Sequence, residues 1–292
     1  MLLERCFAER ADGFFIDVGA WHPVLDSVTY HFSQKGWSGI NVEPSPQYYE
    51  LLERARPRDI NLQLVVGESE GTVRFTVVAG SQLSTAKPMD EGFRRDLAQD
   101  GFLSSEIDLP MRTLAAVCAE HVPADVEIDF LKIDVEGFEE RVIRGADWQS
   151  YRPRILIMEA LQQVGVDVNT DAPITEDSSS QWEPFILDQG YIAAGTTGVN
   201  RFYVRTEDEQ LASVLFTPAN VLDGFVSYDL ILAREEAAAL RADVEQINAE
   251  HEALEKSIGT LEEQVTQILS STSWRATAPL RALSRLVRRQ WC

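Results

Sequence analysis

Two short stretches near the N-terminus join apolar strand patterns to residues that can bind a nucleotide. Residues 14–20 form an apolar run that contains Asp17 and Gly19. This pattern predicts a buried parallel strand and a tight turn at which a ligand can approach the backbone. Residues 39–44 repeat the pattern and include Glu43, a carboxylate placed to accept hydrogen bonds from ribose hydroxyls. Together they predict one nucleotide pocket, the alternative being that Asp17 and Gly19 only cap a structural turn.

The turn after the first predicted strand lacks the glycines of a dinucleotide fingerprint. Gly19 is followed by Ala20-Trp21-His22-Pro23. The second and third glycines that let a pyrophosphate approach a helix N-terminus are therefore missing. A cofactor without a pyrophosphate fits better, so we predict S-adenosylmethionine, with Ala20 among the residues that bind it. NAD is the alternative cofactor.

A third apolar run places opposite charges in one predicted strand. Residues 128–133 include Lys132 and are followed by Asp134. Because side chains alternate along a strand, Lys132 and Asp134 share a face, with Asp134 at the carboxyl edge where α/β sheets bind ligands. Charges inside a sheet are costly unless paired, which favours a functional site. A structural ion pair is the alternative.

Strand and helix patterns alternate along the chain, which predicts a mostly parallel sheet with right-handed crossovers. Apolar spacing predicts helices over 24–35 and 47–56 and a third strand over 61–66. Residues 80–85 form a polar loop that is a candidate lid, and residues 162–180 are polar, acidic and predicted to be a loop.

Composition and charge exclude some classes of protein. The 292 residues carry a net charge of -21, which argues against a general nucleic-acid binder because little of the surface would neutralise phosphates. The three cysteines lack metal-like spacing and are typical of reduced cytosolic thiols. We expect no signal peptide and no membrane-spanning segment, so the predicted location is cytoplasmic.

The chain resembles the FkbM family of S-adenosylmethionine-dependent methyltransferases over roughly residues 12–206. The resemblance rests on the first strand, on Glu43-Pro44, and above all on the block Lys132-Ile133-Asp134-Val135-Glu136-Gly137. It implies a class I methyltransferase fold with a mostly parallel seven-stranded sheet that ends in an antiparallel hairpin. It also implies O-methylation, often of sugars or polyketide-like hydroxyls.

The resemblance also assigns residues to the site. It implies that Asp17 and Gly19 line the cofactor turn and that Glu43 holds the ribose. Lys132, Asp134 and Glu136 match the second motif of the family, and we take these three as the catalytic set. The family turn usually reads Gly-Ala-Asn, so Trp21-His22-Pro23 is a departure.

Methyl transfer to a hydroxyl requires alignment of the oxygen and a base to take its proton. Asp134 is the first candidate for this base and His22 is the second. Alternatively, Asp134 and Glu159, joined by Glu136, would hold a hard divalent cation that lowers the pKa of the hydroxyl.

A heptad pattern follows the predicted domain of residues 1–225. Apolar residues recur at alternating spacings of four and three, which predicts a coiled coil over 226–270 and a homo-oligomer. His251 is the polar position in this seam. A single helix folded back on the domain is the alternative. The seam comprises Leu240, Val244, Ile247, His251, Leu254, Ile258, Leu261, Val265 and Ile268.

Residues 271–292 form a basic segment with five arginines and no acid. Leucines interleave with these arginines, so the segment is predicted to be a basic amphipathic helix that contacts an anionic membrane surface. Its stretch from Ser273-Trp274-Arg275 through Pro279-Leu280-Arg281 resembles tails found on bacterial polysaccharide glycosyltransferases. A helix that docks on another protein is the alternative.

These patterns predict an oligomeric O-methyltransferase that acts on a hydroxyl of a glycan or lipid-linked saccharide in cell-surface polysaccharide synthesis. Its tail would bring it to the inner face of the membrane. Two other classes remain: a non-catalytic coiled-coil scaffold of a glycan-synthesis complex, and an NAD-dependent enzyme.

Overall fold

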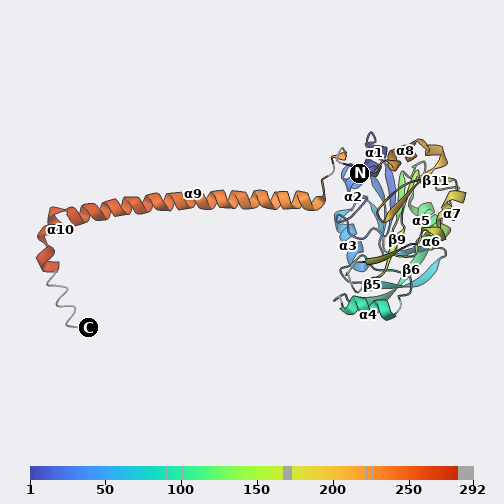
Figure 1. The fold of residues 1–292 in the computed structure, drawn as a ribbon, viewed down its shortest axis with the longest axis horizontal. Helices are drawn as coiled ribbons and strands as arrows, with labels where there is room; N and C mark the ends of the chain where they lie inside the picture. The colour runs from blue at the N-terminus through green and yellow to red at the C-terminus, as the bar shows by residue number, and fades with distance from the viewer. Residues whose placement is uncertain (90, 100, 167–172, 221–222, 225, 282–292) are drawn as a thin grey trace. The chain divides into compact units, whose positions relative to one another are not determined.

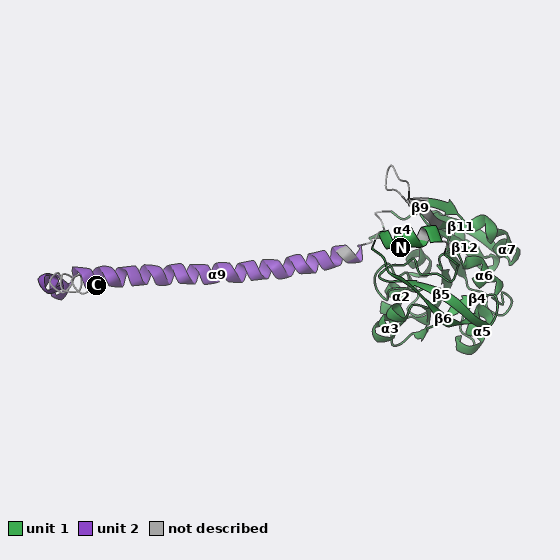
Figure 2. Cartoon of the chain, turned by 90° about the horizontal axis from the view of Figure 1, so that it is seen from below, with its two compact units in different colours: residues 1–224 green, residues 225–292 purple. Residues whose placement is uncertain are grey.

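The computed structural model describes residues 1–89, 91–99, 101–166, 173–220, 223–224 and 226–281. The chain divides into two compact units, Met1–Gly224 (unit 1) and Phe225–Cys292 (unit 2) (Figure 2). Unit 1 contains the sheets and the short helices, and the described part of unit 2 is helical.

Unit 1 (Figure 1) is built on a seven-stranded sheet. Its strand order is β11-β12-β8-β7-β1-β2-β3. The pairs from β3 to β8 are parallel, whereas β12 runs antiparallel to both β8 and β11. This confirms the expected mostly parallel sheet and its final antiparallel hairpin. The strands are β1 (Phe14–Val18), β2 (Ser38–Val42), β3 (Ile60–Leu62), β7 (Phe130–Ile133), β8 (Ile155–Glu159), β11 (Tyr191–Thr197) and β12 (Asn200–Arg205).

Helices cover both faces of this sheet, which explains why its central strands are apolar on both sides. Along β1, Ile16 and Val18 pack into one core cluster, whereas Phe15 packs into the other. The first cluster includes residues of α5 (Leu114–His121), α6 (Glu139–Arg144) and α7 (Glu183–Asp188). The second includes residues of α1 (Leu2–Phe7), α2 (Tyr30–Gln34) and α8 (Gln210–Phe216). The remaining helices of unit 1 are α3 (Pro46–Ala55), α4 (Glu91–Gln99), η1 (Ser179–Gln181) and η2 (Thr206–Asp208).

The single strand predicted over 61–66 is wrong, because this segment contributes to two different sheets. β3 (Ile60–Leu62) pairs with β2, whereas β4 (Val65–Gly67) pairs in parallel with β6 (Ser104–Thr113). β6 also pairs antiparallel with β5 (Gly71–Val78). The segment has apolar residues on both sides of this division because Leu64 and Val66 pack into the core cluster of the main sheet, whereas Val65 packs with Phe75 and Leu109 of the second sheet.

The helix predicted over 24–35 is also wrong in its first half. Only α2 (Tyr30–Gln34) is helical there. The preceding segment is a turn, with Asp26 in the left-handed region at φ 51°. The His22 Nδ1 atom accepts hydrogen bonds from the backbone N–H groups of Val24 and Leu25, at 3.1 and 2.9 Å. These contacts fix the turn in place of a first helical turn.

The loop predicted over 162–180 contains two strands. β9 (Leu161–Val166) pairs antiparallel with β10 (Pro173–Asp177), and residues 167–172 lie outside the described chain. Backbone hydrogen bonds hold such a ribbon together, so a polar sequence without an apolar alternation can form it.

The long helix of unit 2 is α9 (Tyr228–Ser270), with 43 residues. The Ser227 side chain caps its first turn by accepting a hydrogen bond from Leu230 N. At the other end Ser271 leaves the helical conformation and caps α10 (Thr272–Ala276). The predicted basic tail lies outside the described residues from 282 onward. Among the described residues no helix is long and apolar enough to cross a membrane.

Candidate functional site

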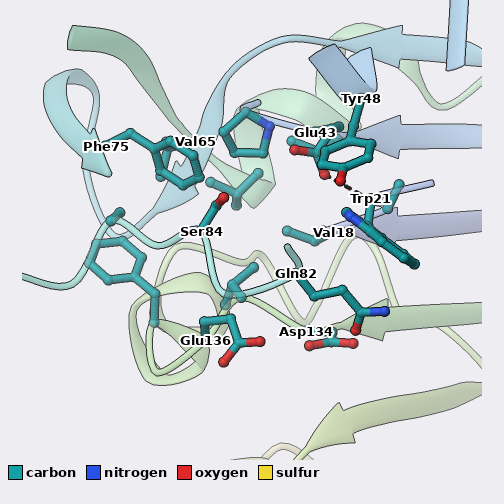
Figure 3. Close-up of a pocket in the computed structure, with 18 of the residues that line it drawn as sticks. Val18, Trp21, Glu43, Tyr48, Val65, Phe75, Gln82, Ser84, Asp134 and Glu136 are labelled. Carbon is teal, nitrogen blue, oxygen red and sulfur yellow. Dashed lines mark hydrogen bonds between the residues drawn. The ribbon is translucent and has the colours of Figure 1, made fainter. Parts of the chain in front are cut away.

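A pocket of about 780 Å³ lies at the carboxyl ends of β1, β2 and β7 (Figure 3). Ligands of α/β sheets bind at this edge. Six of the seven predicted site residues line it: Gly19, Ala20, Glu43, Lys132, Asp134 and Glu136. The structure therefore brings together the ends of three strands that are far apart in sequence.

The turn after β1 is packed tightly against the end of β7. Gly19 has a φ of 84°, and a Cβ atom built on it would lie 1.8 Å from the carbonyl oxygen of Asp134. The N–H groups of Gly19 and Ala20 both donate to the carbonyl of Val42, at 3.0 and 3.1 Å. A glycine is thus required here, because any side chain would displace the β7 backbone.

Lys132 lies beneath this turn and is in contact with three oxygen atoms. Its Nζ atom donates to the Gly19 carbonyl at 2.9 Å and forms ion pairs with Asp17 at 3.3 Å and Asp134 at 3.2 Å. Burial alone would lower the pKa of Lys132, but Asp134 and Asp17 together raise it. Lys132 is therefore a permanent cation that positions the turn, and it does not act as a base.

Asp17 is the one predicted site residue that does not line the pocket. Its side chain is 1% exposed, and it lies opposite Lys132 in the β1–β7 register. Thr29 Oγ1 donates to Asp17 Oδ2 at 3.0 Å and accepts from Arg56 Nη2 at 2.6 Å. Asp17 therefore acts on the pocket through Lys132.

Glu43 is held at the end of β2 by two backbone donors. Trp21 N donates to its Oε2 atom at 2.8 Å, and Ser45 N donates to its Oε1 atom at 2.7 Å. Burial raises the pKa of Glu43 to about 7, although these two N–H groups lower it. Each carboxylate oxygen retains a further acceptor position, so Glu43 can accept hydrogen bonds from a diol at the pocket wall.

Three carboxyl groups converge at the pocket edge. Oxygen atoms of Asp134, Glu136 and Glu159 lie within 4.8 Å of one another. Burial first, and then the charge of Asp134, raise the pKa of Glu136 to about 8 and that of Glu159 to about 10. We call these residues the acid cluster. The raised pKa values favour the protonated forms of Glu136 and Glu159, and a protonated Glu159 donates its hydrogen bond to Asp134.

The acid cluster also has the ligand type that a hard divalent cation prefers. It is the one group of at least three such side chains with this geometry in the described part of the chain. Asp17 is buried behind Lys132 and does not belong to the cluster.

His22, the second candidate for the base, lies in the turn after Ala20. Its Nδ1 atom already accepts two backbone N–H groups, and burial lowers its pKa. This nitrogen has a structural role in the turn, which leaves Asp134 as the candidate with a carboxylate in the pocket.

The sequence patterns did not identify several lining residues. Trp21 and Tyr48 flank Glu43, with ring centroids 5.4 Å apart, and Phe75 lies across the pocket (Figure 3). The position of Trp21 directly after Ala20, a residue predicted to bind the cofactor, is the sequence signal that could have identified Trp21. Phe75 comes from β5, whose place at the pocket depends on the second sheet.

The segment of residues 79–86 closes one side of the pocket. Thr85 pairs with Thr76 through two backbone hydrogen bonds, and Thr85 Oγ1 donates to the Glu136 carbonyl at 3.0 Å. Gln82 Nε2 donates to Asp26 Oδ2 at 3.3 Å. The polar loop predicted here is therefore anchored on both sides and contributes Ser81, Gln82, Ser84 and Ala86 to the lining.

A mostly parallel sheet with a pocket at the carboxyl ends of its central strands is the arrangement in which α/β proteins bind their ligands. The family model of the methyltransferase FkbM domain matches residues 17–193, and the chain belongs to this family. Membership supports methyltransferase activity. No curated protein matches the chain.

The ion pair under the turn generates a stability prediction. Lys132→Met would leave Asp17 buried and unpaired, so we expect the free energy of unfolding to fall by about 3–5 kcal/mol. Adding Asp17→Asn removes the buried, unpaired charge and should recover at least half of this loss in the free energy of unfolding. Urea denaturation followed by tryptophan fluorescence measures both variants.

Lys35→Met is the matched control, since Lys35 is paired with Glu4 at the surface of unit 1. Its loss should stay below about 1 kcal/mol. A Lys132→Met variant no less stable than this control would contradict the role given to Lys132.

Proposed function

We propose that the chain is an S-adenosylmethionine-dependent O-methyltransferase that acts on a hydroxyl of a glycan or lipid-linked saccharide. The observation that carries the proposal is the placement of Glu43 beside the Gly19 turn, in one pocket with Asp134. The sheet order, with a final antiparallel hairpin, supports a class I methyltransferase fold.

The residues of the pocket fit the proposed cofactor. Glu43 would accept hydrogen bonds from both ribose hydroxyls, and the amino-acid end would lie at the part of the pocket lined by Gly19 and Ala20. Tyr48, Val65 and Phe75 offer an apolar wall for the adenine. S-adenosylmethionine would supply a methyl group already activated on sulfonium.

Asp134 is the proposed base. It lines the pocket, and its side chain is 33% exposed, which leaves it accessible to an acceptor hydroxyl. Lys132, 3.2 Å away, fixes the position of the carboxylate. Asp134 would take the hydroxyl proton, while protonated Glu136 would donate a hydrogen bond to a neighbouring oxygen of the acceptor and Glu159 would donate to Asp134.

A divalent cation at the acid cluster is the other arrangement of the same reaction. The convergence of Asp134, Glu136 and Glu159 within 4.8 Å supports it. The three carboxylates would then be ligands, and the cation would lower the pKa of the hydroxyl.

A hydroxyl-rich acceptor is favoured because several carboxyl groups at the pocket edge can bind neighbouring hydroxyls. The proposal also includes a role in cell-surface polysaccharide synthesis and contact of the tail with the inner membrane face. Both rest on the likeness of this basic tail to glycosyltransferase tails. A non-catalytic scaffold is the competing function, and it would not require an intact cofactor pocket.

Cofactor binding distinguishes a methyltransferase from a non-catalytic scaffold. Calorimetric titration should show that S-adenosylhomocysteine binds and that NAD does not. Glu43→Ala should weaken binding about 10- to 100-fold, because hydrogen bonds to a charged group contribute about 1.5–3 kcal/mol. Glu50→Ala, at an exposed position of α3, is the control and should bind normally. A wild-type protein that binds neither ligand would leave the scaffold as the function.

The pKa of Glu43 predicts how this binding depends on pH. Ribose hydroxyls donate to the ionised carboxylate, so binding favours the ionised form. With a pKa of about 7 in the free protein, affinity for S-adenosylhomocysteine should rise about tenfold from pH 6 to pH 8. Glu43→Gln should remove this rise. An equally steep profile in Glu43→Gln would assign the titration to another group.

Asp134→Asn tests the base. We expect the turnover number to fall about 10²- to 10⁴-fold, with a far smaller change in affinity for S-adenosylhomocysteine. The assay follows labelled methyl groups from S-adenosylmethionine into a lipid-linked saccharide fraction. Glu140→Gln, on the surface of α6, is the control.

The same assay distinguishes the two arrangements of the acid cluster. Activity that is lost with a chelator and restored by Mg²⁺ would assign the cluster to a cation. Activity that a chelator does not change would show that the acid cluster acts by proton transfer and hydrogen bonding. Full activity of Asp134→Asn under both conditions would contradict both arrangements.

A further inference from the structure

The apolar side chains of the seam on α9 are exposed within unit 2. Their exposures lie between 52% at Val265 and 64% at Leu254. α9 runs unbroken for 43 residues between the Ser227 cap and Ser271, so it does not fold back on itself. Most helical stability in proteins comes from packing of an apolar face, and this face requires a partner.

The residue types along the seam specify the number of strands. In the heptad register, Val244, His251, Ile258 and Val265 occupy a positions. Leucine occupies three of the five d positions from 240 to 268, and isoleucine occupies the other two. Branched residues at a with leucine at d favour a parallel two-stranded coiled coil.

Charges beside the seam add one attractive contact to a parallel pair. Glu236 occupies a g position, and Arg241, five residues later, occupies the next e position. In a parallel pair, each g residue faces the following e residue of the other helix, so Glu236 and Arg241 attract one another twice. The same register places Glu250 opposite Glu255, so the parallel orientation rests on the residue types at a and d, and the Glu236–Arg241 contact fixes the register near the start of the seam.

We propose that α9 binds α9 of a second copy of this chain as a parallel, two-stranded coiled coil. Because α9 follows unit 1 directly in the chain, parallel pairing attaches both catalytic units to the same end of the coil. The proposal does not depend on methyl transfer.

His251 forms the one polar layer within this seam. Its Nδ1 atom is 3.8 Å from Glu255 Oε1 on the same helix. In the parallel pair it also faces His251 and Glu250 of the second copy, while each Glu250 faces Glu255 across the interface. Two imidazoles therefore lie among four carboxylates, and Ile247 and Leu254 form the apolar layers on either side.

Oligomeric state is the first test. Sedimentation equilibrium of the full chain should give a dimer. Ile258→Asp places a charge in the seam and should give monomers, whereas Thr260→Asp, at an exposed c position of the same helix turn, should leave the dimer intact. A wild-type monomer or trimer would overturn the proposal, as would an Ile258→Asp variant that dimerises normally.

Disulfide formation tests the orientation. In a Cys6→Ser, Cys292→Ser background, Leu240→Cys and Ile268→Cys should each form homodimeric disulfides on mild oxidation. A mixture of the two should form few 240–268 cross-links. Cross-linking mainly between 240 and 268 would show antiparallel pairing and contradict the proposal.

A charge exchange tests the assigned register. Glu236→Lys and Arg241→Glu should each weaken the dimer, and the double variant should restore it, because both attractive pairs re-form across the interface. Failure of the double variant to recover relative to the single variants would contradict the g-to-e pairing.

Discussion

The candidate site depends on one buried cation. Lys132 lies opposite Asp17 in the register of β1 and β7, and its Nζ atom reaches the carbonyl of Gly19 and the carboxylate of Asp134. A lysine in the centre of a sheet is costly unless it is paired. Here the two carboxylates keep it charged, and the same contacts fix the turn after β1 against the end of β7. Pocket geometry and fold stability therefore share one interaction.

The acids at the pocket have different roles because they differ in their contact with this cation. Asp134 is the member of the acid cluster that is paired with Lys132, whereas burial and the charge of Asp134 raise the pKa values of Glu136 and Glu159. Acid–base catalysis requires carboxyl groups whose environments give them different pKa values. Glu43 is separated from this cluster and held by backbone N–H groups, which suits it to ligand binding and not to proton transfer.

The sequence predicted the ends of β2, β7 and β8 well, because each is marked by an apolar run that stops at an acidic residue. This is why Glu43 and Asp134 could be placed at one edge before the fold was described. The prediction from sequence failed where pairing between distant strands overrides the local pattern of residue types. The apolar residues from 61 to 66 divide between two sheets, and the segment from 79 to 86 reaches the pocket through backbone pairing of Thr85 with Thr76, which leaves no periodic signal. The role of Asp17 behind Lys132 likewise depends on register, which strand patterns alone do not give.

The account's central claim is that Lys132 makes the turn after β1 competent to bind the cofactor. The most direct measurement is calorimetric titration of S-adenosylhomocysteine into Lys132→Met/Asp17→Asn, a variant whose stranded charge has been removed. Because nothing would then hold the Gly19 carbonyl, we expect a folded protein that binds at least about tenfold more weakly than the wild type, a loss of about 1.4 kcal/mol or more. A folded double variant with wild-type affinity would contradict the account.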